Sequence, residues 1–209
     1  MIIAVIGSGG KLGSAICKEL EKNNKLLKFD KEDNFGIVQL KQADIAVDAS
    51  VHTNTLAVAQ CCAISKIPLL VCTTGHTKSE IKKIEKLKKQ TKICMCPNLS
   101  VGINKIVEWL ENSKFENCKV SIFERHHINK KDAPSGTALW LKNVVSHIDN
   151  NPEIVSSRFG DDVGTHVVTL DMPHEQITII HKAKDRSVFA LGAKYKIENF
   201  LKENSAHEN

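Results

Sequence analysis

Short apolar runs alternate with stretches of helical periodicity through the first half of the chain. The run Ile2–Ile6 leads into glycines, which is typical of a strand buried on both faces of a sheet. From Leu12 to Leu20, apolar residues recur at every fourth position and predict a helix. The alternation continues, with strands predicted over residues 25–29, 45–47, 68–72 and 93–96, and helices over 53–65 and from Lys78 onward. This order predicts an α/β fold with a Rossmann-like, doubly wound parallel sheet.

The second half of the chain has a different pattern. The elements predicted there are helices over 103–110, 135–147 and 187–200, and strands over 119–124, 165–170 and 175–180. The last two strands are β-branched and alternating, and the turn-prone stretch 171–174 joins them as a hairpin. We therefore expect a C-terminal α+β domain with a mixed or antiparallel sheet.

Composition excludes some classes of protein. The 209 residues contain no apolar run near the ~20 that span a bilayer, so no membrane partner is expected. The apolar opening Met1–Ile6 is too short for a signal peptide. Seven cysteines without an export signal indicate a reducing, cytoplasmic location. The net charge of +5 suits anionic small molecules or nucleic acid and does not choose between them.

The lysine-rich helix and the cysteines on the fifth predicted strand are best explained as structural features. Ile81, Ile84 and Leu87 give the lysine-rich helix a narrow apolar stripe, which leaves its lysines as a solvated face. Without interleaved aromatic residues, no nucleic-acid partner is expected. Cys94 and Cys96 lie on a predicted strand without a second ligand pair at zinc spacing, so no metal is expected.

A glycine-rich loop connects the first strand to the first helix. Gly7, Gly10 and Gly13 fit a G-x-x-G-x-x-G spacing, because position 12 is leucine and the strict G-x-G-x-x-G fails there. Small residues let the backbone approach a pyrophosphate that rests on the helix N-terminus. Asp30 closes the second strand 17 residues after Gly13, where it can accept hydrogen bonds from a ribose. An acidic residue favours NAD, but Lys31 softens its charge, so the cofactor is NADH or NADPH.

Two later loops follow predicted parallel strands, at the edge where such sheets bind ligands. One covers residues 72–75, with Thr73 and Thr74, and the other covers 96–102, with Asn98. Their hydroxyl and amide groups suit a nicotinamide carboxamide and ribose. Ordinary turn chemistry explains either loop nearly as well when it is taken alone.

The densest group of reactive side chains lies in the stretch 124–138. Two histidines and a lysine stand immediately before a predicted helix start, which offers a capping serine and free backbone N–H groups in its first turn. These residues are His126, His127, Lys130, Ser135, Gly136 and Thr137. Such a helix start binds an anion, most simply a carboxylate, and a histidine titrates near neutral pH. The stretch predicts an active site for a small acid.

Together these motifs resemble the 4-hydroxy-tetrahydrodipicolinate reductase family, also called dihydrodipicolinate reductase. The resemblance covers nearly the whole chain, and its most specific part is His-His-x-x-Lys-x-Asp-Ala-Pro-Ser-Gly-Thr-Ala over 126–138. It implies a homotetrameric enzyme that reduces a cyclic dicarboxylate with NADH or NADPH in lysine and diaminopimelate biosynthesis. Residues 1–104, completed by the helix within 187–209, would then be the dinucleotide-binding domain, and 105–186 the substrate-binding and oligomerisation domain.

The resemblance also implies roles for individual residues. His126 and Lys130 take the acid/base and proton-donor positions, and His127 binds a substrate carboxylate with Gly136 and Thr137. The positions that match the family's cofactor site are Gly7, Ser8, Gly9, Gly10, Lys11, Leu12, Asp30, Cys72, Thr73, Thr74, Cys96, Pro97, Asn98 and Leu99.

The chain departs from the family pattern at several positions. The segment between Asp30 and Ile45 is short, Cys72 stands where a glycine is usual, and Leu99 stands where an aromatic residue is usual. None of these changes removes a group that the chemistry needs. Two other functions remain open: a Rossmann regulator that senses NAD(H) without turnover, and a related imine or aldehyde reductase that acts on another dicarboxylate.

Overall fold

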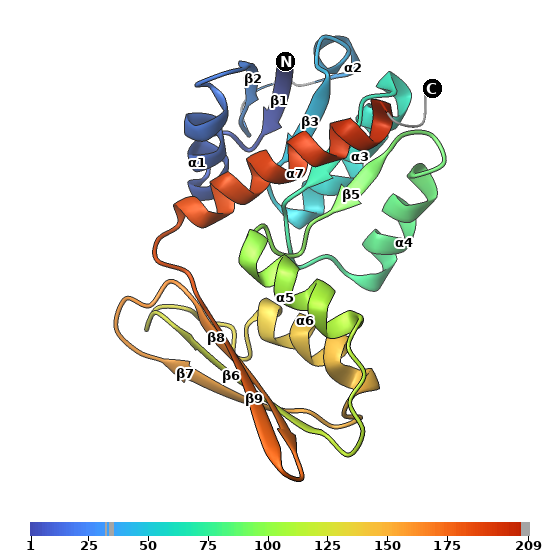
Figure 1. Ribbon diagram of the computed structural model, residues 1–209. Helices are drawn as coiled ribbons and strands as arrows, with labels where there is room; N and C mark the ends of the chain where they lie inside the picture. The colour runs from blue at the N-terminus through green and yellow to red at the C-terminus, as the bar shows by residue number, and fades with distance from the viewer. Residues whose placement is uncertain (32, 34–35, 206–209) are drawn as a thin grey trace. The chain divides into compact units, whose positions relative to one another are not determined.

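The computed structural model describes residues 1–31, 33 and 36–205, which form two compact units. The first unit comprises residues 1–99 together with the chain from Phe189 onward. The second unit comprises Ser100–Val188. Figure 1 traces the chain through both units, from blue at the N-terminus to red in the last helix.

Five parallel strands make up the sheet of the first unit. They are β1 (Ile2–Ile6), β2 (Lys25–Phe29), β3 (Ile45–Asp48), β4 (Leu69–Val71) and β5 (Ile93–Met95). Their order is β2-β1-β3-β4-β5, and every neighbouring pair is parallel, which confirms the predicted Rossmann-like sheet. The strand order changes direction at β1, so the carboxyl ends of β1 and β3 flank a switch point of the kind at which such sheets bind ligands.

Helices cover both faces of this sheet (Figure 1). They are α1 (Lys11–Leu20), α2 (Ile37–Leu40), α3 (His52–Ser65), α4 (Lys78–Leu87) and α7 (Ser187–Ser205). Ile16 of α1 and Ile197 of α7 belong to one apolar cluster, and Val58 of α3 and Ile84 of α4 belong to the other. Apolar side chains on both faces explain why the strands read as continuous apolar runs.

The short segment after Asp30 contains one element that the sequence pattern did not reveal. Helix α2 carries Leu40, which is fully buried in the cluster beside α3 and α4. A helix of 4 residues is too short to show helical periodicity. Residues 32 and 34–35 of this segment lie outside the described residues.

The second unit contains a mixed sheet of four strands. They are β6 (Lys119–His126), β7 (Glu153–Arg158), β8 (Thr165–Met172) and β9 (Glu175–Lys182), in the order β7-β6-β8-β9. β7 runs parallel to β6, and the other neighbours are antiparallel, which confirms the predicted mixed sheet. Strand β7 was not predicted, because Ser156 and Arg158 stand on its buried side. Apolar residues at these positions would have given the alternation of apolar and polar residues that marks a strand.

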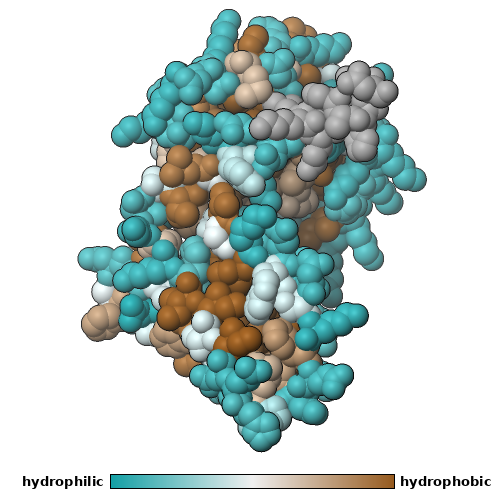
Figure 2. All heavy atoms as spheres, viewed as in Figure 1, coloured by the Kyte–Doolittle hydropathy of each residue, from teal (hydrophilic) through white to brown (hydrophobic). Residues whose placement is uncertain are grey.

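Helices α5 (Val101–Glu111) and α6 (Gly136–Val144) pack on one face of this sheet. The opposite face, which we call the outer sheet face, carries Phe123, Val155, Val167 and Ile180 on four adjacent strands. Val155 is 49% exposed and Ile180 is 67% exposed. Figure 2 shows hydrophobic residues gathered over the strands of this unit.

Candidate active site

The glycine-rich loop brings backbone groups closer together than side chains would allow. Gly7 has a φ of 81°, and a Cβ on it would lie 2.7 Å from the backbone N of Ser50. A Cβ on Gly13 would lie 2.0 Å from the carbonyl O of Gly7. The loop enters α1 through Gly10, which has no side chain to cap the first turn. The loop thus offers a closely approachable backbone and a helix N-terminus, which together suit a pyrophosphate.

Asp30 stands beside this loop. It follows β2, and its Oδ2 lies so close to Gly9 that a Cβ there would be 1.9 Å away. Its Oδ1 accepts a hydrogen bond from the N–H of Lys31 at 2.9 Å, and its own N–H donates to Oδ2 of Asp33 at 2.7 Å. The structure therefore brings together the two predicted parts of a nucleotide site. Their role in binding stays a prediction.

Three of the expected cofactor positions in the two later loops have buried side chains. Cys72, Cys96 and Leu99 are at most 5% exposed and belong to the apolar cluster beneath α1 and α7. Burial also raises the pKa of the Cys72 thiol above its usual range, so this thiol stays protonated. Any contact that these three residues make with a nucleotide comes from the backbone. Thr74 and Pro97, by contrast, are exposed.

Thr73 is part of a polar cluster that the sequence did not reveal. Its hydroxyl lies 2.9 Å from Oγ1 of Thr55 and 3.2 Å from Nε2 of His76. Burial lowers the pKa of His76 and outweighs the nearby carboxylates, so the ring is neutral near pH 7. The hydroxyl of Thr73 is thus held in place from α3 and from the loop before α4.

Asp48, at the carboxyl end of β3, was also missed. It is fully buried, and its Oδ1 accepts hydrogen bonds from the backbone N–H of Ser50 at 3.0 Å and from its Oγ at 2.5 Å. Its Oδ2 has no hydrogen-bond partner among the described residues. The carboxylate orders Ser50, whose backbone lies against Gly7. An acidic residue that directly ends an apolar strand was the available signal.

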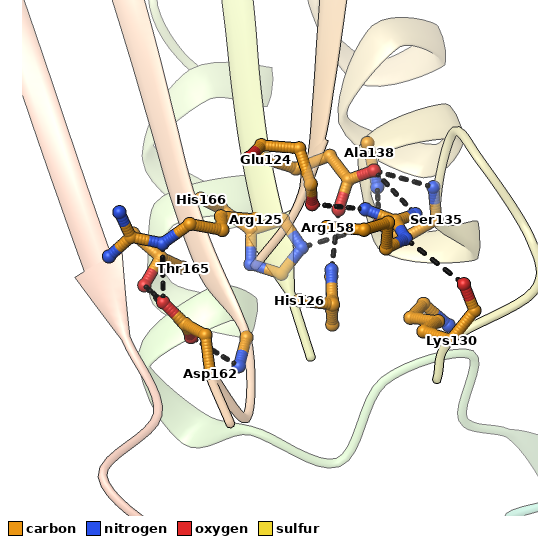
Figure 3. Close-up of polar contacts among 12 residues, drawn as sticks. Glu124, Arg125, His126, Lys130, Ser135, Ala138, Arg158, Asp162, Thr165 and His166 are labelled. Carbon is orange, nitrogen blue, oxygen red and sulfur yellow. Dashed lines mark hydrogen bonds and ion pairs between the residues drawn. The ribbon is translucent and has the colours of Figure 1, made fainter. Parts of the chain in front are cut away.

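In the second unit, Glu124 joins His126 to Arg158 (Figure 3). Glu124 and His126 are two residues apart on β6, so their side chains lie on the same face of the sheet. Nδ1 of His126 lies 2.5 Å from Oε2 of Glu124, and Nη2 of Arg158 lies 2.9 Å from Oε1. The backbone N–H of Ser135 donates to the same Oε1 at 3.3 Å. Neither Glu124 nor Arg158 was predicted from the sequence to have a role in the site.

Burial and neighbouring charges set the protonation of this pair. Burial acts to raise the pKa of Glu124, but hydrogen bonds from Arg158 and His126 outweigh it and leave the pKa below the usual range. Burial lowers the pKa of His126 and outweighs the opposing pull of Glu124, while Lys130 and Arg158 lower it further. Near pH 7 the carboxylate is therefore ionised and the imidazole neutral. Nδ1–H then donates to Glu124, which leaves Nε2 as a proton acceptor.

Lys130 lies in the loop that follows β6. Its Nζ donates to Oδ1 of Asp132 at 2.8 Å, and its side chain is 23% exposed. Arg158 fixes this loop by donating to the carbonyl groups of Lys130 and Asp132. The backbone N–H of Lys130 also donates to the carbonyl of His127 at 3.0 Å. The loop thus holds a cation on a backbone anchored to β7.

The capped helix start that the sequence predicted is present at α6. Its role in binding an anion stays a prediction. Ser135 caps the helix, with its Oγ accepting the N–H of Ala138 at 3.2 Å. A Cβ on Gly136 would meet no heavy atom within 4 Å, so the first turn is open on that side. The helix ends at Val144, and a 3₁₀ turn continues to His147. His127, Lys130, Gly136 and Thr137 are thus carried by one loop and the helix start that follows it.

Two further histidines complete the polar interior of this unit. The ring of His166 on β8 lies edge-on to that of His126, with centroids 5.2 Å apart, and His181 on β9 lies 6.2 Å from His166. Burial lowers the pKa of His166 to about 4, and the other two histidines add to the effect. In sequence, both histidines occupy positions that alternate with the outward-facing residues of the hairpin and are otherwise apolar. A histidine at such an inward position was the available sign that it would be buried.

Within residues 1–31, 33 and 36–205, no group of three or more His, Cys, Asp or Glu side chains is placed to hold a metal ion. Over the same residues, no helix has the length and apolar character needed to cross a membrane.

Known proteins with a similar sequence cover almost the whole chain. The family model for the N-terminus of dihydrodipicolinate reductase matches residues 1–99, and the model for its C-terminus matches residues 102–207. A 4-hydroxy-tetrahydrodipicolinate reductase from Caldanaerobacter subterraneus subsp. tengcongensis is 31% identical, over 96% of this chain and 93% of the relative. The enzyme of the same name from Thermosipho africanus is 34% identical, over 92% of this chain and 88% of the relative.

Solved structures show the same fold. A dipicolinate-bound dihydrodipicolinate reductase from Paenisporosarcina sp. TG-14 superposes with a TM-score of 0.79 at 18% identity, covering 95% of this chain and 93% of that chain. An aspartate dehydrogenase from Thermotoga maritima has a TM-score of 0.63 at 8% identity, covering 96% of both chains. Because both family models match and the relatives exceed 30% identity over nearly the full length, this chain belongs to the dihydrodipicolinate reductase family.

Proposed function

We propose that this protein reduces 4-hydroxy-tetrahydrodipicolinate to tetrahydrodipicolinate, a step in lysine and diaminopimelate biosynthesis, with NADH or NADPH as the hydride donor. The observation that carries the proposal is the constellation around the start of α6. It combines the fixed cation of Lys130, the neutral His126 on the buried carboxylate of Glu124, and an open helix N-terminus. The relatives that bear the same enzyme name over most of this chain support it.

The substrate is a ring with two carboxylates, and the second unit offers suitable partners for one of them. The N-terminus of α6, with Gly136 and Thr137, receives one carboxylate through backbone N–H groups and a hydroxyl. His127 binds the same carboxylate from the preceding loop. Because a buried anion needs hydrogen bonds or an opposite charge, this arrangement favours a ring that carries a carboxylate over a neutral ring.

Hydride addition to the ring builds negative charge that a proton must relieve. The ammonium group of Lys130 supplies this proton, and Asp132 orients it. His126 accepts or returns a proton at Nε2, because Nδ1–H is engaged by Glu124. A general acid of this kind contributes ~10²–10⁴-fold to the rate.

The nicotinamide nucleotide would be held by the first unit and would supply the hydride when bound. The backbone from Gly7 to Leu12 and the N-terminus of α1 hold the pyrophosphate, and Asp30 accepts hydrogen bonds from the adenosine ribose. Thr73, Thr74 and Asn98 are the polar side chains proposed for the nicotinamide end. NADH is the preferred donor because the Asp30 carboxylate repels a 2′-phosphate.

We also propose that the protein assembles as a homotetramer through the outer sheet face. Val155 and Ile180 are large apolar residues that remain 49% and 67% exposed in the single chain. Contiguous exposed apolar residues of this kind are typical of interaction surfaces. A second copy that packs its own sheet on this face would bury them.

A coupled assay tests the proposed function. Pyruvate and aspartate semialdehyde are condensed by the upstream synthase, this protein is added, and the loss of nicotinamide absorbance is followed with NADH and NADPH separately. Rapid oxidation that requires both the synthase product and this protein is the expected result. A folded protein that binds nucleotide without oxidising it would favour the sensor. Oxidation with another dicarboxylate imine or aldehyde, and not with this substrate, would favour the related reductase.

A further inference from the structure

The carboxylate of Glu124 is held from three separate segments of the second unit. It projects from β6, its Oε1 receives the guanidinium of Arg158 from β7, and the same oxygen receives the backbone N–H of Ser135 at the start of α6. Glu124 is fully buried. Because two donors occupy Oε1, the other oxygen, Oε2, is left facing Nδ1 of His126. The direction of this carboxylate is therefore fixed by its surroundings.

The opposite edge of the His126 ring faces a position without a side chain. A Cβ on Gly164 would lie 3.1 Å from Nε2 of His126 and 3.4 Å from Cδ2. Any larger residue there would crowd this edge of the ring. The ring plane is supported by the edge-on contact with His166. The surroundings thus engage Nδ1 and leave room at Nε2.

We propose that Glu124, clamped by Arg158, is a positioning residue that holds His126 in the tautomer with its proton on Nδ1 and presents Nε2 to the substrate. The inference rests on the proposed function for the role of Nε2, but the tautomer can be measured without turnover. Glu124 does not itself touch the reacting atoms. It acts by fixing which nitrogen of His126 is free to exchange a proton.

Substitution of Glu124 by glutamine should reverse the tautomer of His126, while the side chain at position 124 keeps nearly the same shape. The amide oxygen of Glu124→Gln remains with Arg158 and the Ser135 N–H, because both are donors. Its NH₂ group then faces His126 and donates to Nδ1, which forces the proton onto Nε2. The ring is kept in place but presents a donor where the native ring presents an acceptor. A tautomer reversed in this way is expected to lower kcat by ~10²–10⁴-fold.

The measurement combines the NMR spectrum of the full-length protein with its pH profile. Nitrogen-15 shifts of the histidine rings distinguish the two tautomers, and His126→Asn identifies the His126 signals. The charged and titratable groups around this ring are Glu124, Lys130, Arg158 and His166. Among these groups only the Glu124 carboxylate favours the protonated imidazolium of His126. Its loss in Glu124→Gln should therefore lower the pKa of His126 and move the acid limb of kcat to lower pH.

Asp149 offers a matched control. It is a buried carboxylate of the same unit whose Oδ2 accepts the N–H of Val120 at 2.9 Å, at the opposite end of β6 from His126. Asp149→Asn should lower thermal stability and leave both the tautomer and the acid limb unchanged. Glu124→Asp keeps the charge and should recover part of the kcat that Glu124→Gln loses.

The outcomes separate this inference from the proposed function. Nδ1–H in the native protein and Nε2–H in Glu124→Gln, with a displaced acid limb, support the positioning role. The same tautomer in both proteins would overturn it, whatever happens to kcat. A loss of kcat matched by Asp149→Asn, with the acid limb unmoved, would also overturn it and mark Glu124 as structural. Absence of turnover in the native protein would refute the reductase function, while the tautomer would still decide the positioning role.

Discussion

The carboxylate of Asp30 lies against the backbone of Gly9, so closely that a Cβ on Gly9 would be 1.9 Å from Oδ2. Gly9 lies in the loop before α1, and Asp30 follows the end of β2. Their contact places a negative charge beside the loop that we propose for the pyrophosphate. This relationship leads to a prediction about the choice of nucleotide.

Asp30→Asn should shift the preference from NADH towards NADPH. The amide keeps the shape and hydrogen-bonding capacity for a ribose but removes the charge that repels a 2′-phosphate. We expect the ratio of kcat/KM for NADPH to that for NADH to rise by about tenfold, or ~1.4 kcal/mol. Asp44→Asn removes a charge from the same unit while retaining an acceptor for the N–H of Ile2, and should leave the ratio unchanged. An equal shift in both variants would mean that overall charge, not Asp30, sets the preference.

Gly13→Ala should destabilise the first unit and weaken nucleotide binding. The added Cβ would lie 2.0 Å from the carbonyl O of Gly7, and a backbone atom cannot move aside as a flexible side chain can. We expect a loss of about 1–3 kcal/mol in the free energy of unfolding, measured by denaturant titration. Gly136→Ala is the comparison, since its Cβ would meet nothing within 4 Å, and it should leave stability intact. Native stability in Gly13→Ala would contradict the tight packing of the loop.

Lys130→Met should lower kcat by ~10²–10⁴-fold, because the substitution removes the proposed proton donor and keeps the length of the side chain. The affinity for nucleotide, measured by fluorescence titration, should not change. Lys131→Met is a matched control, since Lys131 is the next residue and is exposed. If the two variants retain equal turnover, Lys130 is not the proton donor.

Acid should destabilise the second unit partly through His166. Burial lowers its pKa to about 4 in the folded protein, below the ~6.5 of an unfolded chain. Between these values only the unfolded state takes up the proton, so stability falls as the pH drops from 6.5 to 4 and this contribution levels off below pH 4. The full effect is about 3 kcal/mol.

The measurement is urea unfolding at pH 7 and at pH 4.5. His166→Gln should reduce the difference in unfolding free energy between the two pH values by about 2 kcal/mol. His174→Gln, in the exposed turn between β8 and β9, should leave the difference as it is. His76, His126 and His181, whose pKa values burial also lowers, act in the same direction and contribute to the part that remains. An unchanged difference in His166→Gln would show that this ring is not neutral in the folded protein.

Ile180→Glu should prevent assembly through the outer sheet face. A charge in an apolar interface loses its hydration without gaining a partner. We expect sedimentation velocity to show a tetramer for the native chain and a smaller species for the variant. Leu139→Glu places the same charge on an exposed apolar residue of α6 and should leave assembly unchanged. A native chain that sediments as a monomer would refute the proposed tetramer directly.

The sequence by itself determined the sheet of the first unit and the start of α6. Strands buried on both faces leave continuous apolar runs, as in Ile2–Ile6, and the glycine loop follows such a run directly. Helix caps are equally local, because Ser135 bonds a backbone N–H only three residues away. Features that depend on neighbours in the chain are therefore readable from the chain.

Only the tertiary structure decided which groups surround His126. Arg158 reaches Glu124 from a strand that is 34 residues away in sequence, and His166 reaches the ring of His126 from β8. Strand β7 was not predicted because polar residues stand on its buried side and break the apolar alternation. The burial of Arg158 on that side is explained by its ion pair with Glu124, which only the folded sheet brings about. Sequence spacing carries no information about such pairing across strands, because the sheet order β7-β6-β8-β9 places side by side residues that are far apart along the chain. The reactive residues could thus be predicted from the sequence, whereas their protonation and orientation arise from burial in the folded sheet.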